Sequence, residues 1–264
     1  MWDINLIVTS LISLGISTIL VVISLILSRI FKFSMEKEIV IGCTQAVIQL
    51  LIIGFIMYFI FYTGYVFLII ILLAIMLVVG ALLIFRNYRY IKGSFFISII
   101  SLTASASITL TILLGTGIVE FDMYSLMAFG GIIIGNSMKR GSVAFENFIE
   151  EVKKQKKQIE LKLSLGANKR ESLNSSISSS VYICLLPTLN SLKAIGIVWI
   201  PGGMLGMLLG GVSPIWAAVY QAIIMFSILC AGLIVSILIT TFLSRIIINK
   251  RLQVNNEILY GEKK

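Results

Sequence analysis

Histidine is absent from this chain of 264 residues, and cysteine, proline and charged side chains are scarce. Charged residues make up 12% of the sequence and apolar residues 58%, with a mean hydropathy of +1.05. Without histidine the chain lacks the commonest transition-metal ligand and the usual acid–base catalyst. Cys43, Cys184 and Cys230 stand far apart in apolar surroundings, without the spacing of a metal site or a disulfide framework. We therefore expect no resident cofactor.

Motifs of enzymes are missing as well. The sequence has no Walker A, GxSxG or HExxH pattern. Its apolar runs carry no pair of carboxylates, which argues against a proton-coupled carrier, because such carriers relay protons through intramembrane acids. We expect that the chain is not an enzyme and that any energy it uses comes from a partner.

Long apolar runs dominate what is present. A membrane-spanning helix needs about 20 mostly apolar residues, and a soluble core in a chain of this length could not bury so much apolar surface. The sequence predicts an all-α, polytopic transmembrane helical bundle that forms one domain over residues 1–264. About seven spans are expected, the fifth short enough to be re-entrant, at 5–28, 39–62, 66–85, 94–119, 123–138, 188–209 and 215–243.

The basic residues predict the orientation. If the N-terminus lies outside, all 21 lysines and arginines fall in inner connections or the C-terminal tail, as expected for cytoplasmic loops. The chain should therefore be N-out and C-in, a multi-pass protein of the cell membrane (a bacterial inner or plasma membrane) in contact with the lipid bilayer. The same rule explains the net charge of +9, so we expect no nucleic-acid partner.

One inner connection, 139–187, is long and predicts its own structure. Its apolar residues share one helix face, which either lies on anionic lipid or belongs to a helix that extends the fifth span. After a break at Gly166 and Ala167, Asn168 can cap a second helix with Glu171 as the partner of a capping box. That short helix should end before Pro187 and the sixth span. A short helix held below the membrane is a docking element.

Polar side chains inside the apolar runs suggest a substrate path. Gln45 and Gln49 stand four residues apart on one helix face, where they either line a path or join helices by hydrogen bonds. Glycines at 130, 131 and 135 and at 202, 206 and 210 favour either close helix packing or a gated segment. A weak path lined by oxygen and sulfur would use Gln45, Gln49, Asn136, Asn190, Met204 and Met207.

Several motifs in order resemble a known family of permeases of ATP-binding-cassette (ABC) transporters. The stretch 160–167, with Glu160 six positions before Gly166, resembles the cytoplasmic coupling motif of ABC permeases. The closer resemblance is to the FetB-type (YbbM-like) family, whose bacterial members are associated with iron export and plant relatives with aluminium tolerance. It covers nearly the whole chain and is carried by Gly135-Asn136-Ser137-Met138, 163–167, Leu186-Pro187-Thr188, Ser191-Leu192-Lys193, Pro201-Gly202 and Tyr220-Gln221. The chain departs from the family pattern at Lys139, at Gly203 and in the serine-rich stretch 175–180.

The resemblance implies a membrane-spanning permease subunit that exports iron or another metal. Its implied partners are a cytoplasmic ATPase subunit, which hydrolyses the ATP, and a second copy of the chain. The residues it implies for ATPase coupling are Glu160, Leu163, Leu165, Gly166 and Ala167. Two alternatives stay open: a membrane interaction or regulatory protein without transport, and a passive channel.

Overall fold

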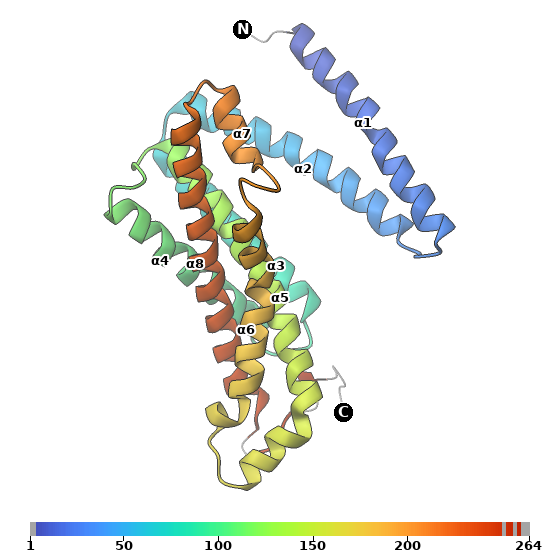
Figure 1. The fold of residues 1–264 in the computed structure, drawn as a ribbon, viewed down its shortest axis with the longest axis vertical. Coiled ribbons are helices and arrows are strands. Elements are labelled where there is room, and N and C mark those ends of the chain that lie inside the picture. The colour runs from blue at the N-terminus through green and yellow to red at the C-terminus, as the bar shows by residue number, and fades with distance from the viewer. Residues whose placement is uncertain (1–3, 250–251, 256–257, 260–264) are drawn as a thin grey trace. The chain divides into compact units, whose positions relative to one another are not determined.

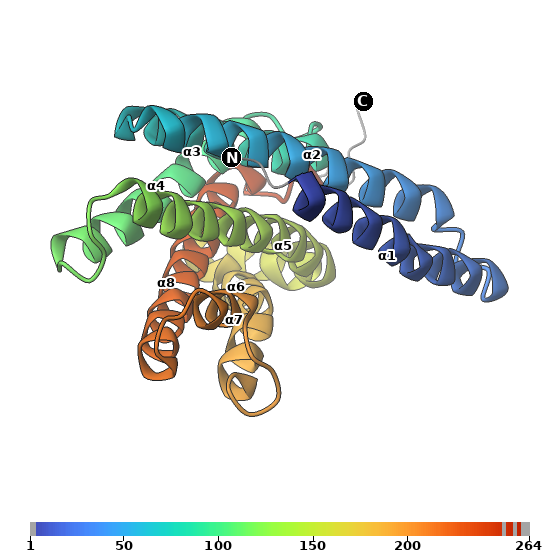
Figure 2. The ribbon, with the colours of Figure 1, turned by 90° about the horizontal axis from the view of Figure 1, so that it is seen from above.

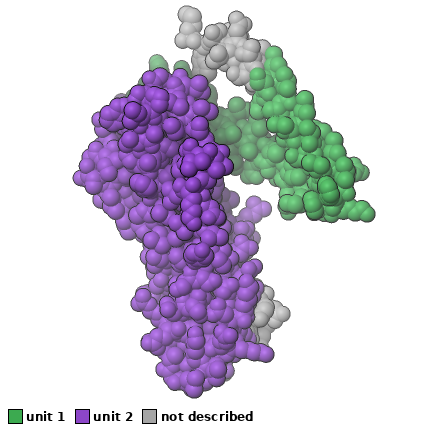
Figure 3. Space-filling view, in the orientation of Figure 1, with its two compact units in different colours: residues 1–64 green, residues 65–264 purple. Residues whose placement is uncertain are grey.

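The computed structural model describes residues 4–249, 252–255 and 258–259, with side chains from residue 12 onward. In these residues the chain is helical apart from its connections and two isolated β-bridges. It divides into two compact units, residues 1–64 and 65–264 (Figure 3). The predicted all-α fold class is confirmed. That residues 1–264 form a single domain stays a prediction.

Unit 1 is a helical hairpin of α1 (Ile4–Ile30) and α2 (Glu36–Thr63). The predicted turn after α2 is present: Gly64 has a φ of 74° and donates its N–H to Ile60 O at 3.1 Å. Within the described side chains, α2 buries Ile60 and leaves nearly all its other apolar side chains exposed. Such a surface needs lipid or another helix to cover it.

Unit 2 contains the other six helices (Figures 1 and 2). Helix α5, 42 residues long, is in contact with α3, α4, α6 and α8, and it forms a long hairpin with α6. Helix α7 contacts α8. The bounds are α3 (Val66–Asn87), α4 (Ser94–Gly115), α5 (Met123–Ser164), α6 (Lys169–Ala194), α7 (Gly202–Leu209) and α8 (Pro214–Ile247).

Among the described residues, five helices are long and apolar enough to cross a membrane: α1 from Ile12, α2, α3, α4 and α8. They correspond to the first four and the last of the predicted spans. A polytopic membrane bundle is thereby confirmed, whereas the total of seven spans and the N-out orientation stay predictions.

The predicted sixth span, 188–209, is wrong. Helix α6 continues through Pro187 and ends at Ala194, and an irregular connection leads to α7 at Gly202. The chain leaves the helix because Gly196 has a φ of +78° and Pro201 disfavours a helical residue before it. A proline within a membrane helix is tolerated where neighbouring groups supply partners for the freed backbone.

The second half of α5 shows which of the two structures predicted for the amphipathic stretch is present. Its apolar face belongs to the protein core, since Phe145, Phe148 and Val152 are fully buried. Tyr88, in the connection from α3 to α4, stacks on Phe145 with ring centroids 4.2 Å apart. The face therefore packs on protein and does not lie on lipid. The helix extends the segment 123–138 without a break, as the second of the two readings predicted.

Candidate coupling site and substrate path

The α5–α6 hairpin ends in a tip whose backbone bonds are satisfied locally. We call residues 161–171 the coupling tip. Gly166 has a φ of +90°, and its N–H and that of Ala167 bond Leu163 O at 3.1 Å and Lys162 O at 3.0 Å. This pair of bonds is the Schellman motif, which ends a helix at a left-handed glycine. A side chain at residue 166 would strain this turn.

The predicted capping box at the start of α6 is confirmed. Asn168 Oδ1 accepts from Glu171 N at 2.9 Å, and Glu171 Oε2 accepts from Asn168 N at 3.1 Å. These bonds satisfy donors that a helix otherwise leaves unpaired at its start. The tip therefore joins the end of α5 to the start of α6 through a short connection whose backbone is fixed by hydrogen bonds.

Two side-chain contacts hold the tip against the rest of unit 2. Ser175 Oγ donates to Gln155 Oε1 at 2.7 Å, which joins α6 to α5. Lys169 Nζ donates to the carbonyl oxygens of Ile248 at 3.0 Å and Asn249 at 3.4 Å, just beyond the end of α8. These bonds connect the start of α6 to α5 and to the segment just beyond α8.

The residues predicted for ATPase coupling divide into two kinds. Leu163 is 3% exposed and belongs to the core, so it supports the tip from inside. Leu165 is 79% exposed at the outermost turn, with Gly166 exposed beside it. Glu160 and Ala167 are half-buried. Leu161, which was not singled out from the sequence, is 60% exposed and adds to the apolar surface of the tip.

The residues of the predicted substrate path are scattered. Gln45 and Gln49 lie in unit 1, where both are exposed and line a cavity of about 420 Å³ with Thr44. Asn136 on α5 is half-buried and bonds its own helix at Ile132 O, 2.9 Å away. Asn190 is exposed on α6. That these residues line one route stays a prediction.

Met204 lies in a better defined cavity of unit 2. This cavity of about 330 Å³ is enclosed by the end of α6, the connection after it, α7 and α8, and Met207 is not among its lining residues. Gln221 and Met225 of α8 line it too, and the amide oxygen of Gln221 is buried without a hydrogen-bond partner. The site thus combines apolar walls with one free acceptor, as small-molecule pockets do. The sequence analysis named Gln221 only as part of the motif Tyr220-Gln221, which resembles the permease family, and assigned it no role in a substrate path.

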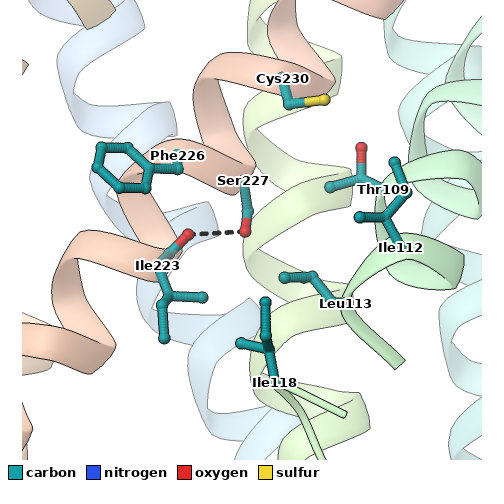
Figure 4. Close-up of a pocket in the computed structure, with 8 residues that line it drawn as sticks. All are labelled: Thr109, Ile112, Leu113, Ile118, Ile223, Phe226, Ser227 and Cys230. Atoms are coloured by element: carbon teal, nitrogen blue, oxygen red, sulfur yellow. Dashed lines mark hydrogen bonds between the residues drawn. The ribbon is translucent and has the colours of Figure 1, made fainter. Parts of the chain in front are cut away.

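A second cavity of unit 2, of about 210 Å³, lies between α4 and α8 (Figure 4). Ser227 uses its hydroxyl hydrogen on Ile223 O at 2.7 Å, whereas the hydroxyl of Thr109 is buried without a partner. The remaining lining is apolar apart from the Cys230 thiol. Its walls suit an apolar group rather than an ion.

A resident metal centre has no counterpart in the part of the chain that the structure describes. No group of three or more histidine, cysteine, aspartate or glutamate residues converges there.

Comparisons with known proteins place the chain in a family. The model of the uncharacterised protein family UPF0014 matches residues 11–248. The UPF0014 membrane protein YjkA of Bacillus subtilis is 31% identical over 92% of this chain and 98% of its own length. The probable iron export permease protein FetB of Escherichia coli is 31% identical over 91% of this chain and 93% of its own.

A plant relative is also similar, the protein ALUMINUM SENSITIVE 3 of Arabidopsis thaliana, at 28% identity over 83% of this chain and 80% of its own. No solved structure matches the chain. The family model covers nearly the whole sequence, and the membrane proteins among the relatives agree with the apolar helices seen here. The chain therefore belongs to the UPF0014 family and is a multi-pass protein of the cell membrane.

Proposed function

We propose that the chain is the membrane-spanning subunit of an ABC transporter, which exports iron or another metal with ATP hydrolysed by a separate cytoplasmic subunit. The observation that carries this proposal is the coupling tip, with its exposed Leu165 on a backbone fixed by the Schellman motif and the capping box. An apolar side chain held rigidly outside the bundle suits a hydrophobic groove on a partner.

The names of the relatives support export as the direction of transport and iron as its cargo. One of them is named a probable iron export permease, and it aligns with 91% of this chain. In this reading the chain itself hydrolyses no ATP. Closure of the ATPase subunits displaces the coupling tip, and the contacts of Ser175 and Lys169 carry that displacement into α5 and the end of α8.

A second copy of the chain is part of the proposal. Gly202 and Gly206 stand four residues apart on α7, and a Cβ atom at either would meet nothing within 4 Å. Glycines at this spacing let another helix approach closely in a membrane. Leu205 and Leu209, 49% and 84% exposed, add apolar surface on the same helix.

The coupling tip is tested by co-expression with the ATPase encoded nearest to the gene and purification through a tag on the permease. L165A should lose the ATPase, because it removes the most exposed apolar contact without disturbing the core. L50A is the matched control, a leucine of α2 that is 69% exposed, and should retain the ATPase. Retention of the ATPase by both L165A and a deletion of 163–167 would contradict the proposal.

A further inference from the structure

Ser105 and Ala231 stand in the middle of α4 and α8, two helices of unit 2 that are long and apolar enough to cross a membrane. Ser105 Oγ donates to Ala231 O at 2.7 Å and lies 3.1 Å from Ser137 Oγ. Ser105 stands eleven residues from the first residue of α4 and ten from the last. Ala231 stands seventeen and sixteen residues from the ends of α8. Helix α4 has 22 residues, about the length that crosses the hydrocarbon core, so its middle residue Ser105 lies near the midplane, and Ala231, bonded to it, lies at a similar depth.

Arg140 lies close to this layer. It follows Ser137 by three residues on α5, which is about 4.5 Å along the helix axis. The half-thickness of the hydrocarbon core is about 15 Å. A Cβ atom at Gly232, the neighbour of Ala231, would stand 3.3 Å from Cγ of Arg140. The arginine stem therefore packs on the middle of α8.

The guanidinium group is incompletely satisfied. Its Nη1 donates to the carbonyl oxygen of Cys184 on α6 at 3.3 Å, and its Nε is buried without a partner. In the part of the chain that the structure describes, no carboxylate forms an ion pair with Arg140. A charged side chain at this depth is costly unless it faces water or an opposite charge.

Lys139, the preceding residue, is exposed on the surface of the protomer. It lies about 3 Å along the axis from Ser137, at nearly the same depth as Arg140. An ammonium group that faces hydrocarbon at this depth is costly, so its exposed position favours a surface in contact with water or a second chain. The two adjacent cations thus give this part of α5 a positive charge.

We propose that Arg140, with Lys139 beside it, forms a site inside the membrane that binds an anionic oxygen group, a carboxylate or phosphate, of the transported solute. Guanidinium groups bind such oxygens through paired, charge-assisted hydrogen bonds, and Nε is the donor left free. The inference rests on the proposed transport function and specifies its cargo. A fixed positive charge repels a bare metal cation, so a metal would cross as an anionic chelate.

Water access is tested by cysteine labelling of the full-length permease with its ATPase in liposomes. K139C is introduced together with C43A and C230A, and Cys184 stays because it is buried. A sulfonate-bearing, membrane-impermeant methanethiosulfonate should modify K139C. The matched control is C43A alone, which keeps the exposed Cys230 at the same depth on an apolar cavity and should not react. Labelling of K139C no faster than that of Cys230 would overturn the proposal.

Binding is tested with three probes: Fe²⁺ alone, citrate alone and the anionic ferric–citrate complex. The wild type should bind citrate and its complex but not Fe²⁺. R140Q should weaken that binding about tenfold or more, the loss expected for a charged hydrogen bond. R140K should lie in between, and K193Q, an exposed lysine of α6, should bind as the wild type does.

Each variant is first checked for a single size-exclusion peak and for co-purification of the ATPase, which tests the proposed function separately. If R140Q does not fold, the comparison is made with K139Q and R140K. Equal binding of ferric citrate by wild type and the charge-removing variant would overturn the anion site even where the ATPase complex is intact. Binding of Fe²⁺ alone, or of no anionic probe, would overturn it too.

Discussion

The hydroxyl of Ser175 on α6 donates a 2.7 Å hydrogen bond to the side-chain oxygen of Gln155 on α5. The amide nitrogen of Gln155 in turn bonds Glu151 at 3.0 Å on the same helix. These bonds join the two arms of the hairpin just behind the coupling tip. A connection of this kind is what the proposed docking of an ATPase at the tip requires, because it links the tip to both arms.

The capping box should stabilise the start of α6. N168A removes the acceptor for Glu171 N and should cost about 1 kcal/mol of stability. Hydrogen exchange should accelerate at the amides of Asn168 to Ser172 and the ATPase should bind more weakly. N174A, an exposed asparagine within the same helix, serves as the control and should change neither. Unaltered exchange in N168A would contradict the role of the cap.

Ser105 should contribute to stability through its bonds to α5 and α8. S105A leaves Ala231 O and Ser137 without this partner and should destabilise the bundle by about 0.6–2 kcal/mol in a detergent unfolding titration. S107A, on the exposed face of the same helix, should have almost no effect. Equal stability losses in the two variants would show that the buried layer contributes nothing specific.

The glycines of α5 should differ in their tolerance of a methyl group. A Cβ atom at Gly141 would stand 3.0 Å from Ile239 Cδ1 and 3.3 Å from Ile84 Cδ1, so G141A should destabilise unit 2 by about 1–3 kcal/mol. Gly135 has open space, and G135A should be neutral or slightly stabilising because alanine favours a helix. Thermal unfolding of the two variants checks this, and a larger loss in G135A would contradict the packing described.

Much of the fold could be predicted from the sequence, because lipid-exposed helices require uninterrupted apolar runs. The runs that became α1 to α4 and α8 are of that kind. The run 188–209 looked the same, yet it breaks after Ala194, where Gly196 and Pro201 set the backbone. Composition alone does not distinguish a spanning helix from a bent segment packed on α8.

In the candidate site too, the features that follow from neighbouring residues could be predicted, and those that follow from distant contacts could not. Asn168, Glu171 and Gly166 follow motifs that lie within a few residues of one another, so the sequence predicted the glycine break and the capping box correctly. It wrongly ended the second helix before Pro187, through which α6 continues. The sequence placed Arg140 in the inner connection by its neighbours in the chain, and that placement stays a prediction. The contacts of Arg140 with α6 and α8, on which the proposed site rests, join residues more than forty positions apart, so no local pattern shows them.

Asp122 should give α5 a stability that depends on pH. Its side chain caps the helix by accepting from Tyr124 N at 3.0 Å, and hydrogen bonds, chiefly from the Ser125 side chain, hold the pKa of this carboxyl below its ordinary value of 3.8. A lowered folded-state pKa means that the contribution is complete above the ordinary value and is lost as the pH falls through the folded one.

This dependence is measured as the difference in Tm between the wild type and D122N, since asparagine caps a helix without titrating. The difference should be constant from neutral pH to about pH 5 and should shrink below about pH 4. A difference that does not respond to acid would contradict the charged cap.

The central claim is that the chain is the permease of an ATP-driven exporter. Its most direct test is reconstitution of the permease with its ATPase in liposomes, with the movement of iron, supplied as Fe²⁺ and as ferric citrate, followed with and without ATP. We predict flux that requires ATP and is lost in L165A but not in L50A. Iron flux independent of ATP, or a stable ATPase complex that moves no metal, would contradict it.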